Sequence, residues 1–329
     1  MTPILHHSIT PLGFAGKSKR VGIGGIKDTT LHLLGKIEVY RERRNAVILA
    51  HNYQLGEIQD AADFVGDSLE LSRKAAETTA DTIVFCGVHF MAETAKILSP
   101  QKTVLLPDLE AGCPMADMLT VEQLREFKAQ YPGRPVVAYV NTSAAVKAEV
   151  DICCTSANAV KVVESVGADE VLFVPDKCLA DYIASKTSKK IIPYPGFCPT
   201  HVRILPEDIL KQKALHPDAL VIVHPECTRA VIQLADGVFS TSGMLRFARE
   251  SPAPEFIIGT EEGILHRLWK ENPNKKFYSP TEHAVCPNMK LITLEKLVWS
   301  LEDMRYPIEL PSDIIDRARG AIRRMLEIV

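Results

Sequence analysis

The chain has 329 residues, of which 46% are hydrophobic and 24% charged, and its formal net charge is −3. This length and composition are typical of a globular protein with two or three domains. The small net charge without a basic run predicts no nucleic-acid partner, and the lack of an apolar stretch of about 20 residues predicts no membrane span. Residues 1–20 lack the apolar core of a signal peptide, which favours a cytoplasmic location.

From about residue 45 onward, short apolar runs alternate with amphipathic segments. The runs predicted to be strands are 46–50, 64–66, 82–86, 103–107, 135–140, 151–154, 170–174, 190–194, 219–223, 237–240, 255–259 and 275–280. The segments predicted to be helices are 68–79, 89–98, 156–168, 177–186, 242–251, 262–271, 291–304 and 311–329. This alternation predicts parallel sheets covered on both faces by helices. Residues 1–30 are predicted to be an irregular arm, whose glycines follow no strand and form no dinucleotide fingerprint.

Several landmarks recur at steps of 85 or 88 positions along the chain. They are three Cys-Pro pairs starting at Cys113, Cys198 and Cys286, three residues that follow apolar runs (His51, Tyr139, His224) and three hydroxyls that open amphipathic segments (Ser68, Ser156, Thr241). Such a period indicates a triplicated supersecondary unit. We therefore expect three αβα units with short parallel sheets, related by a pseudo-threefold axis and with the active site at their junction.

We place the first unit at residues 1–116, including the N-terminal arm, and expect the helices of 290–329 to pack back on it. The second and third units are placed at 117–199 and 200–289. In open α/β sheets, ligands bind beyond the carboxyl ends of the strands. The side chains at these ends should therefore meet in one central pocket.

Polar residues stand at the expected strand ends. The first strands lead into His51, Tyr53, Tyr139, Val140, Asn141, His224, Pro225 and Glu226, and the second strands into Ser68, Ser156 and Thr241. A hydroxyl there is often a plain helix cap and a histidine often a core residue. Three hydroxyls in register instead favour an anion site at helix N-termini, for a phosphate or several carboxylates. Glu226 is the carboxylate of this set and the first candidate for a general base.

The cysteines fall into two groups. Those without counterparts in the other units fit small core residues; they are Cys86, Cys153, Cys154, Cys178 and Cys227. The three in register lack the CxxC spacing of a structural zinc site. Three long-range cysteines would hold one [4Fe–4S] cluster and leave one iron without a protein ligand, as a Lewis acid suited to dehydration and condensation. Proline after each cysteine favours an extended cysteine, and His201 stands either at the cluster's edge or on the surface.

The chain also resembles a known family over about residues 35–305. The matching motifs are AHNYQ (50–54), GDSLELSRKAA (66–76), LPDLEAGCPMADM (106–118), AYVNTSAAVKAEVDICCTSANAV (138–160), PGFCPTHVRI (195–204), HPEC (224–227) and STSGM (240–244). They are similar to those of the quinolinate synthases, the A proteins of NAD biosynthesis.

The resemblance implies a transferase that condenses iminoaspartate (iminosuccinate) with dihydroxyacetone phosphate to quinolinate, phosphate and two waters. It implies one [4Fe–4S] cluster on Cys113, Cys198 and Cys286, and a partner such as an aspartate oxidase or dehydrogenase that supplies the imine. The substrate pocket would be lined by His51, Ser68, Tyr139, Val140, Asn141, Ser156, His224, Pro225, Glu226 and Thr241, with Tyr53 and His201 assisting proton movement. Some members carry a CxxCxxC run ending in the third ligand, whereas Cys286 stands alone here, so we expect no dithiol switch.

Two alternatives remain open at this stage. One is a radical enzyme of the diphthamide-synthesis type, which also has three units with one cysteine each and would need S-adenosylmethionine and a protein substrate. The other is a non-enzymatic iron–sulfur sensor or a zinc-stabilised scaffold. A sensor or scaffold does not account for the His, Tyr and Ser residues in the same register.

Overall fold

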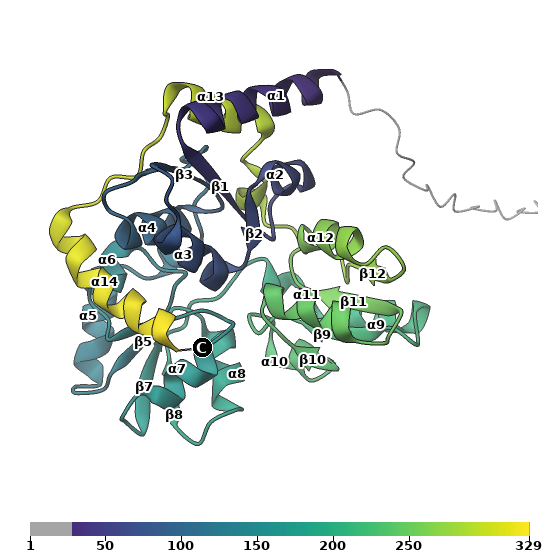
Figure 1. Ribbon diagram of the computed structural model, residues 1–329. Coiled ribbons are helices and arrows are strands. Elements are labelled where there is room, and N and C mark those ends of the chain that lie inside the picture. Colours follow the sequence, from purple (N-terminus) through teal and green to yellow (C-terminus); the bar gives the residue numbers. More distant parts are fainter. Residues whose placement is uncertain (1–27, 329) are drawn as a thin grey trace, which may run out of the picture.

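The computed structural model describes residues 28–328, and Figure 1 shows three αβα units that follow one another along the chain. Each unit contains one four-stranded sheet in which every pair of neighbouring strands is parallel. The strand order is the same each time: second, first, third, fourth. These features confirm the predicted fold class.

The elements have the following bounds. The first unit contains α1 (Asp28–Arg43), β1 (Ala46–His51), α2 (Gly56–Ala61), β2 (Phe64–Gly66), α3 (Ser68–Glu77), β3 (Thr82–Cys86), α4 (His89–Leu98), β4 (Thr103–Leu105) and the 3₁₀ turn η1 (Ala116–Met118). The second contains α5 (Val121–Gln130), β5 (Val136–Tyr139), α6 (Ala144–Lys147), β6 (Ile152–Cys154), α7 (Ala159–Ser165), β7 (Glu170–Val174), α8 (Lys177–Ala184), β8 (Lys190–Pro193) and η2 (His201–Arg203). The third contains α9 (Pro206–Leu215), β9 (Leu220–Val223), α10 (Arg229–Ile232), β10 (Gly237–Val238), α11 (Thr241–Glu250), β11 (Glu255–Gly259), α12 (Ile264–Glu271), β12 (Lys276–Tyr278) and η3 (Pro287–Lys290), and α13 (Leu294–Asp303) and α14 (Ser312–Glu327) follow.

The predicted strands and helices are present, with ends that differ by a few residues. The prediction named no helix ahead of each first strand, where α1, α5 and α9 lie. Residues 28–30 begin α1 and so are not part of an irregular arm, which corrects that part of the prediction. The rest of the predicted arm, residues 1–27, lies outside the described residues.

One side-chain contact to the backbone repeats in all three units and supports the triplication. An aspartate just before each second strand accepts the backbone N–H of a residue in the first strand, over N···O distances of 2.8, 2.7 and 2.8 Å. The pairs are Asp63 with Ile48, Asp151 with Val136, and Asp236 with Val221. Because the three aspartates keep the 88- and 85-residue steps, they fix the same β-α-β crossover each time.

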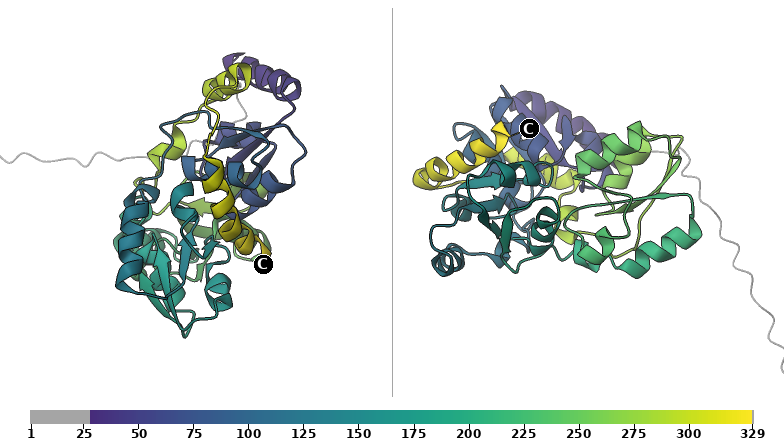
Figure 2. Two further views of the ribbon diagram at one scale, coloured as in Figure 1. Left: turned by 90° about the vertical axis from the view of Figure 1, so that its left-hand side faces the viewer. Right: turned by 90° about the horizontal axis from the view of Figure 1, so that it is seen from below.

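The last two helices lie in different places. α13 packs side by side with α1, as both views in Figure 2 show, and the Arg44 guanidinium donates to the carbonyl of Leu301 at 3.1 Å. α14 lies against α4 but also against α6 and β6, and Asn158 donates to the carbonyl of Met325 at 3.1 Å. Only α13 therefore packs on the first unit alone, whereas α14 bridges the first and second units. The exact unit boundaries stay a prediction.

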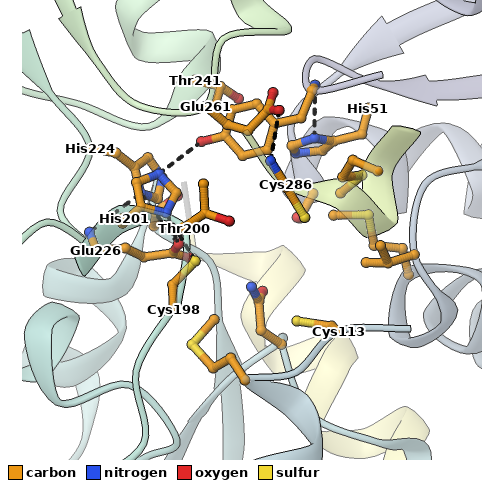
Figure 3. Close-up of a pocket in the computed structure, with 18 of the residues that line it drawn as sticks. His51, Cys113, Cys198, Thr200, His201, His224, Glu226, Thr241, Glu261 and Cys286 are labelled. Atoms are coloured by element: carbon orange, nitrogen blue, oxygen red, sulfur yellow. Dashed lines mark hydrogen bonds and ion pairs between the residues drawn. The ribbon is translucent and has the colours of Figure 1, made fainter. Parts of the chain in front are cut away.

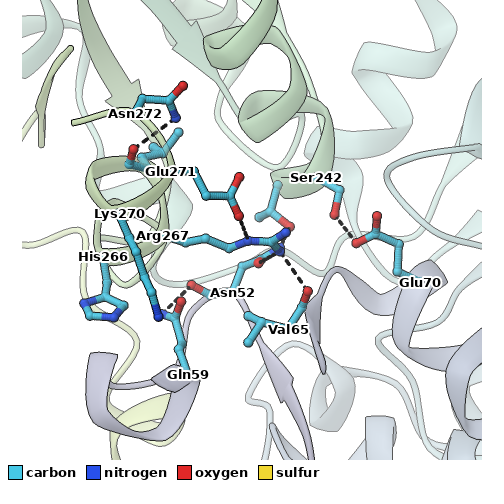
Figure 4. Close-up of polar contacts among 12 residues, drawn as sticks. Asn52, Gln59, Val65, Glu70, Ser242, His266, Arg267, Lys270, Glu271 and Asn272 are labelled. Carbon is cyan, nitrogen blue, oxygen red and sulfur yellow. Dashed lines mark hydrogen bonds and ion pairs between the residues drawn. The ribbon is translucent and has the colours of Figure 1, made fainter. Parts of the chain in front are cut away.

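The first and third units meet along α12, where a buried polar network crosses between them (Figure 4). The guanidinium of Arg267 donates to the carbonyl of Val65 at 2.7 Å and to the Asn52 side chain at 3.1 Å, and it pairs with Glu271. Asn52 is fully buried and in turn donates to the Thr241 hydroxyl at 2.8 Å. One arginine thus connects α12 to the loop after β1 and to the start of α11.

Replacing Arg267 by alanine should lower the free energy of unfolding by about 1–3 kcal/mol, because the buried Asn52 amide and the Val65 carbonyl lose a charged donor. Arg249 offers a matched control, since its side chain is 61% exposed and pairs only with a neighbouring glutamate at 3.7 Å. Arg249→Ala should change stability by less than about 0.5 kcal/mol. Urea unfolding followed by far-UV circular dichroism measures both, and equal effects would contradict the role given to Arg267.

Candidate active site

A pocket lined by residues of all three units lies where these units meet (Figure 3). All but two of the predicted site residues line it: His51, Tyr53, Ser68, Cys113, Tyr139, Asn141, Ser156, Cys198, His201, His224, Glu226, Thr241 and Cys286. Val140 and Pro225 are buried outside this lining. The topology therefore brings the predicted residues together, while their roles stay predictions.

The three Cys-Pro loops are anchored in the same way. In each unit the residue at or near the start of the helix after the third strand donates its backbone N–H to the carbonyl two residues before the cysteine, over 2.8, 2.8 and 2.9 Å. The pairs are His89 with Ala111, Lys177 with Gly196, and Glu262 with Ala284. A 3₁₀ turn then follows each cysteine, and Cys286 has the extended backbone predicted for a residue before proline (φ −91°, ψ 105°).

Exposure separates the two groups of cysteines. Cys113, Cys198 and Cys286 are partly exposed to the pocket, whereas the other five are buried. Burial raises the pKa of the Cys113 thiol to about 12 and also raises the pKa values of the other two pocket thiols. The pocket thus favours neutral thiols unless a cation binds there, and the lining within residues 28–328 contains no Lys or Arg side chain.

Glu226 lies at the centre of the polar half of the pocket. It is 4% exposed, and its carboxylate accepts hydrogen bonds from His201 Nδ1 at 2.7 Å and from the Tyr139 hydroxyl at 2.6 Å. Burial alone would raise the pKa of this carboxyl, but the His201 contact and the Tyr139 hydroxyl outweigh it and keep the pKa below its usual value. The anionic form of Glu226 is therefore the stable one in this pocket.

A series of hydrogen bonds from Tyr53 also reaches Glu226 through His201. The Tyr53 hydroxyl lies 2.5 Å from the Thr260 hydroxyl, which lies 2.8 Å from His201 Nε2. Because His201 Nδ1 faces the Glu226 carboxylate, that nitrogen carries a proton and Nε2 accepts from Thr260. Tyr53, Thr260, His201 and Glu226 thus form a continuous hydrogen-bonded path. Thr260 was not among the predicted residues.

His51 and His224 occupy equivalent places and have the same tautomer. The backbone N–H two residues further on donates to Nδ1 of each ring, from Tyr53 at 3.2 Å and from Glu226 at 3.3 Å. The ring proton therefore lies on Nε2, and His224 Nε2 donates to the Ser156 hydroxyl at 3.2 Å. Burial lowers the pKa of both rings to about 3, so both act as neutral N–H donors.

The helix-terminal hydroxyls differ in detail from the prediction. The caps of α3 and α11 are Asp67 and Ser240, so Ser68 and Thr241 are the first helical residues instead of the caps. Ser156 lies in the turn before α7. In the described structure none of the three hydroxyls makes a capping hydrogen bond to its own helix, and all three residues line the pocket.

The ends of the third strands also contribute residues that the sequence analysis missed. Val88, Asp176 and Glu261 keep the same 88- and 85-residue steps, and the first and last of them line the pocket. Their spacing could have identified these three positions, but the residue types differ, one valine and two acids, so the repeat is not conspicuous in the sequence.

Asn141 indicates a ligand contact, because its side-chain oxygen is buried without a hydrogen-bond partner in the described structure. A ligand that donates a hydrogen bond there would satisfy it.

The fold and the pocket define a triplicated αβα protein with three thiols and a buried acid–base group at one junction. The family model described as "Quinolinate synthetase A protein" matches residues 35–327. A quinolinate synthase of Dehalococcoides mccartyi is 61% identical over 293 residues, which is 89% of this chain and 97% of the relative. Quinolinate synthase 1 of Methanosarcina acetivorans is 57% identical over 296 residues, 90% of this chain and 97% of the relative. The chain therefore belongs to the quinolinate synthetase A protein family.

Within residues 28–328, no helix has the length and apolar character to cross a membrane.

Stability should fall on mild acidification because His51 and His224 are buried in their neutral forms. Their folded pKa of about 3 lies below the value of about 6.5 in an unfolded chain, so the unfolded chain binds more protons between these pH values. Stability is then complete above about pH 6.5 and decreases toward pH 3, by up to about 1.4 kcal/mol per pH unit for each ring.

Urea unfolding between pH 7 and pH 5.5 measures this slope. A double variant with His51→Asn and His224→Gln should show a smaller loss of stability over this pH range. His32→Gln, at an exposed position of α1, should leave the loss unchanged. An unchanged slope in the double variant would show that other groups set the acid sensitivity.

Proposed function

We propose that this protein is a quinolinate synthase, a transferase of NAD biosynthesis in the cytoplasm. It would condense iminoaspartate with dihydroxyacetone phosphate to quinolinate, phosphate and two waters. The observation that carries the proposal is the convergence of one cysteine from each unit with Glu226 and three hydroxyls in a single pocket. The names of the relatives described above support the same activity.

The overall reaction involves no net oxidation or reduction. Iminoaspartate (C4H5NO4) and dihydroxyacetone phosphate (C3H7O6P) contain together the atoms of quinolinic acid (C7H5NO4), phosphoric acid and two waters. No oxidant or reductant is needed, so the chemistry consists of bond formation, proton transfer and loss of leaving groups. An acid–base path such as that from Tyr53 to Glu226 supplies the proton transfers.

Cys113, Cys198 and Cys286 would hold the iron–sulfur cluster. Each comes from a different unit, all three are partly exposed to the same pocket, and they lack the CxxC spacing of a structural zinc site, so this donor set suits a cluster with three thiolate ligands. When bound, a cluster with one iron free of protein ligands supplies a Lewis acid that polarises a substrate oxygen.

The other lining residues match the charges of the two substrates. One substrate carries two carboxylates and the other a phosphate, and the pocket offers neutral donors for them. His51 and His224 present Nε2–H groups, and Ser68, Ser156 and Thr241 present hydroxyls near the N-termini of α3, α7 and α11. Neutral donors bind anions without forming a fixed ion pair that would have to be broken when phosphate and product leave.

Glu226 is proposed as the general base and Tyr53 as a proton carrier at the other end of the path. The carboxylate is already anionic and buried, so it can take a proton from carbon or nitrogen of the bound intermediate. With Nδ1 protonated and Nε2 as the acceptor, His201 can relay a proton from Tyr53 and Thr260 to Glu226, giving its Nδ1 proton to the carboxylate as Nε2 takes one, and Glu226 can then protonate a leaving oxygen. Tyr139 holds the other carboxylate oxygen and fixes the direction of Glu226.

Anaerobically purified protein should form quinolinate from dihydroxyacetone phosphate and freshly generated iminoaspartate, with one phosphate released per quinolinate. Chromatography of the pyridine product and a phosphate assay measure the two yields. Absence of quinolinate, with formation of methionine or adenosyl fragments from S-adenosylmethionine, would instead support the radical enzyme. Bound zinc without sulfide would support a scaffold.

Glu226→Gln should lower kcat by about 100-fold or more, because a neutral amide cannot act as the base. The cluster content, measured as iron and sulfide per chain, should stay unchanged because Glu226 is not a proposed ligand. Glu250→Gln, on an exposed side chain, is the matched control and should keep normal turnover. Near-normal turnover of Glu226→Gln with an intact cluster would exclude Glu226 as the base.

A further inference from the structure

The carboxyl end of β11 carries a buried acid, Glu261, that the proposed chemistry does not use. Its side chain is fully buried and lines the same pocket as Cys286, as Figure 3 shows. In the triplicate register its counterparts are Val88 in the first unit and Asp176 in the second. The three positions have thus diverged, and the function of Glu261 must be sought in contacts that the other two units lack.

Glu261 contacts the loop of the third cysteine directly. Its carboxylate accepts the backbone N–H of Cys286 at 3.0 Å and that of Gly263 at 2.7 Å. Both oxygens are within ion-pair distance of Lys290 Nζ, at 2.9 and 3.1 Å. A single carboxylate therefore holds the start of the Cys-Pro turn and its end, since Cys286 directly precedes η3 and Lys290 is its last residue.

Lys290 extends this contact to the first unit. Besides pairing with Glu261, its ammonium donates to the carbonyl of Tyr53 at 2.6 Å. Gly263 allows these groups to approach, because a Cβ there would lie 2.6 Å from the Tyr53 carbonyl oxygen and 2.7 Å from Lys290 Nζ. The Cys286 loop and the Tyr53 loop, which come from different units, are thus joined through one buried ion pair.

We propose that Glu261, acting with Lys290, is a positioning residue that sets the place of Cys286 in the pocket and couples it to Tyr53. The cluster-holding role of Cys286 comes from the proposed function, on which this inference rests. The carboxylate of Glu261 accepts the N–H of Cys286 and so ties it to the end of β11. Within the described residues, the Cys-Pro turn itself provides no acceptor for this N–H.

Asp176 shows that an acid at this register position need not act on its cysteine loop. One of its oxygens accepts the N–H groups of Cys178 and Leu179 and so caps α8, and the other has no hydrogen-bond partner among the described residues. The second Cys-Pro loop is held by the backbone anchor at Gly196 and by the His201 side chain, and among the described residues no carboxylate accepts the N–H of Cys198. The third loop therefore has a tether of its own, which makes its dependence on Glu261 testable against Cys198.

The test uses the full chain with Glu261→Leu, which removes both acceptors, and Glu261→Gln, which keeps one for the Cys286 N–H. Lys290→Met is a second variant that leaves Glu261 in place and removes the link to Tyr53. Glu149→Leu is the control, because Glu149 is also a glutamate paired with basic side chains (Arg125 and Arg317), but it lies outside the pocket and its side chain is 17% exposed. Circular dichroism first shows that each variant is folded.

In protein freed of metal, the rate at which iodoacetamide alkylates each cysteine is followed by peptide mass spectrometry. Glu261→Leu should raise the rate at Cys286 by about tenfold, the change expected when a hydrogen bond to a charged group no longer opposes local opening, while Cys198 changes by less than about twofold. Lys290→Met should change Cys286 in the same direction, and Glu261→Gln by less than about threefold. An unchanged rate at Cys286, or an equal rise at Cys198, would overturn the positioning role.

Iron and sulfide per chain in the anaerobically purified variants give the second measurement. Glu261→Leu should lose about half or more of both, and Glu149→Leu should lose neither. If the unmodified protein itself binds no iron–sulfur cluster, the proposed function fails, while the alkylation rates still decide whether Glu261 positions Cys286. If the cluster is normal in Glu261→Leu, the positioning role fails and the proposed function stands.

Discussion

Three cysteines far apart in sequence can share one pocket because each Cys-Pro loop is tied to the end of the third strand of its own sheet. The same backbone hydrogen bond occurs in all three units, from His89 to Ala111 and at the two equivalent positions. In a parallel sheet the carboxyl ends of all strands lie at one edge, so a tether to that edge directs the loop toward the ligand side. The pocket therefore forms because the same strand order and the same loop anchor occur in all three units.

Burial then determines the electrostatics of the pocket. Desolvation raises the pKa values of the three thiols and lowers those of His51 and His224, while hydrogen bonds keep Glu226 anionic. Without a cation the pocket thus contains neutral thiols, the neutral imidazoles of His51 and His224, and the Glu226 carboxylate, while Glu261 in the same lining is paired with Lys290. A bound metal cluster would stabilise the thiolate forms of the three cysteines and would offer one iron as a Lewis acid for a substrate oxygen.

The sequence alone predicts the strands, the triplication and most of the polar lining, because each of these depends on a local pattern repeated in register. Asp63, Asp151 and Asp236 repeat for the same reason, although their contact with the first strand is visible only in the structure. Thr260 could not be recognised, since its role depends on its distance to His201, and although Glu261 shares the repeat register, its contact with Cys286 is visible only in the structure. The position of α14 likewise depends on which exposed surface its apolar face covers, and its own pattern does not specify that surface.

Iron and sulfide content across single Cys→Ser variants tests most directly whether the three loops hold one cluster. The unmodified chain should contain about four irons and four sulfides after anaerobic purification. Serine at position 113, 198 or 286 should each abolish most of this content. Serine at position 86, 153, 154, 178 or 227 should leave it unchanged in folded protein, because those thiols do not line the pocket. Full cluster content in a variant of Cys113, Cys198 or Cys286 would contradict the account.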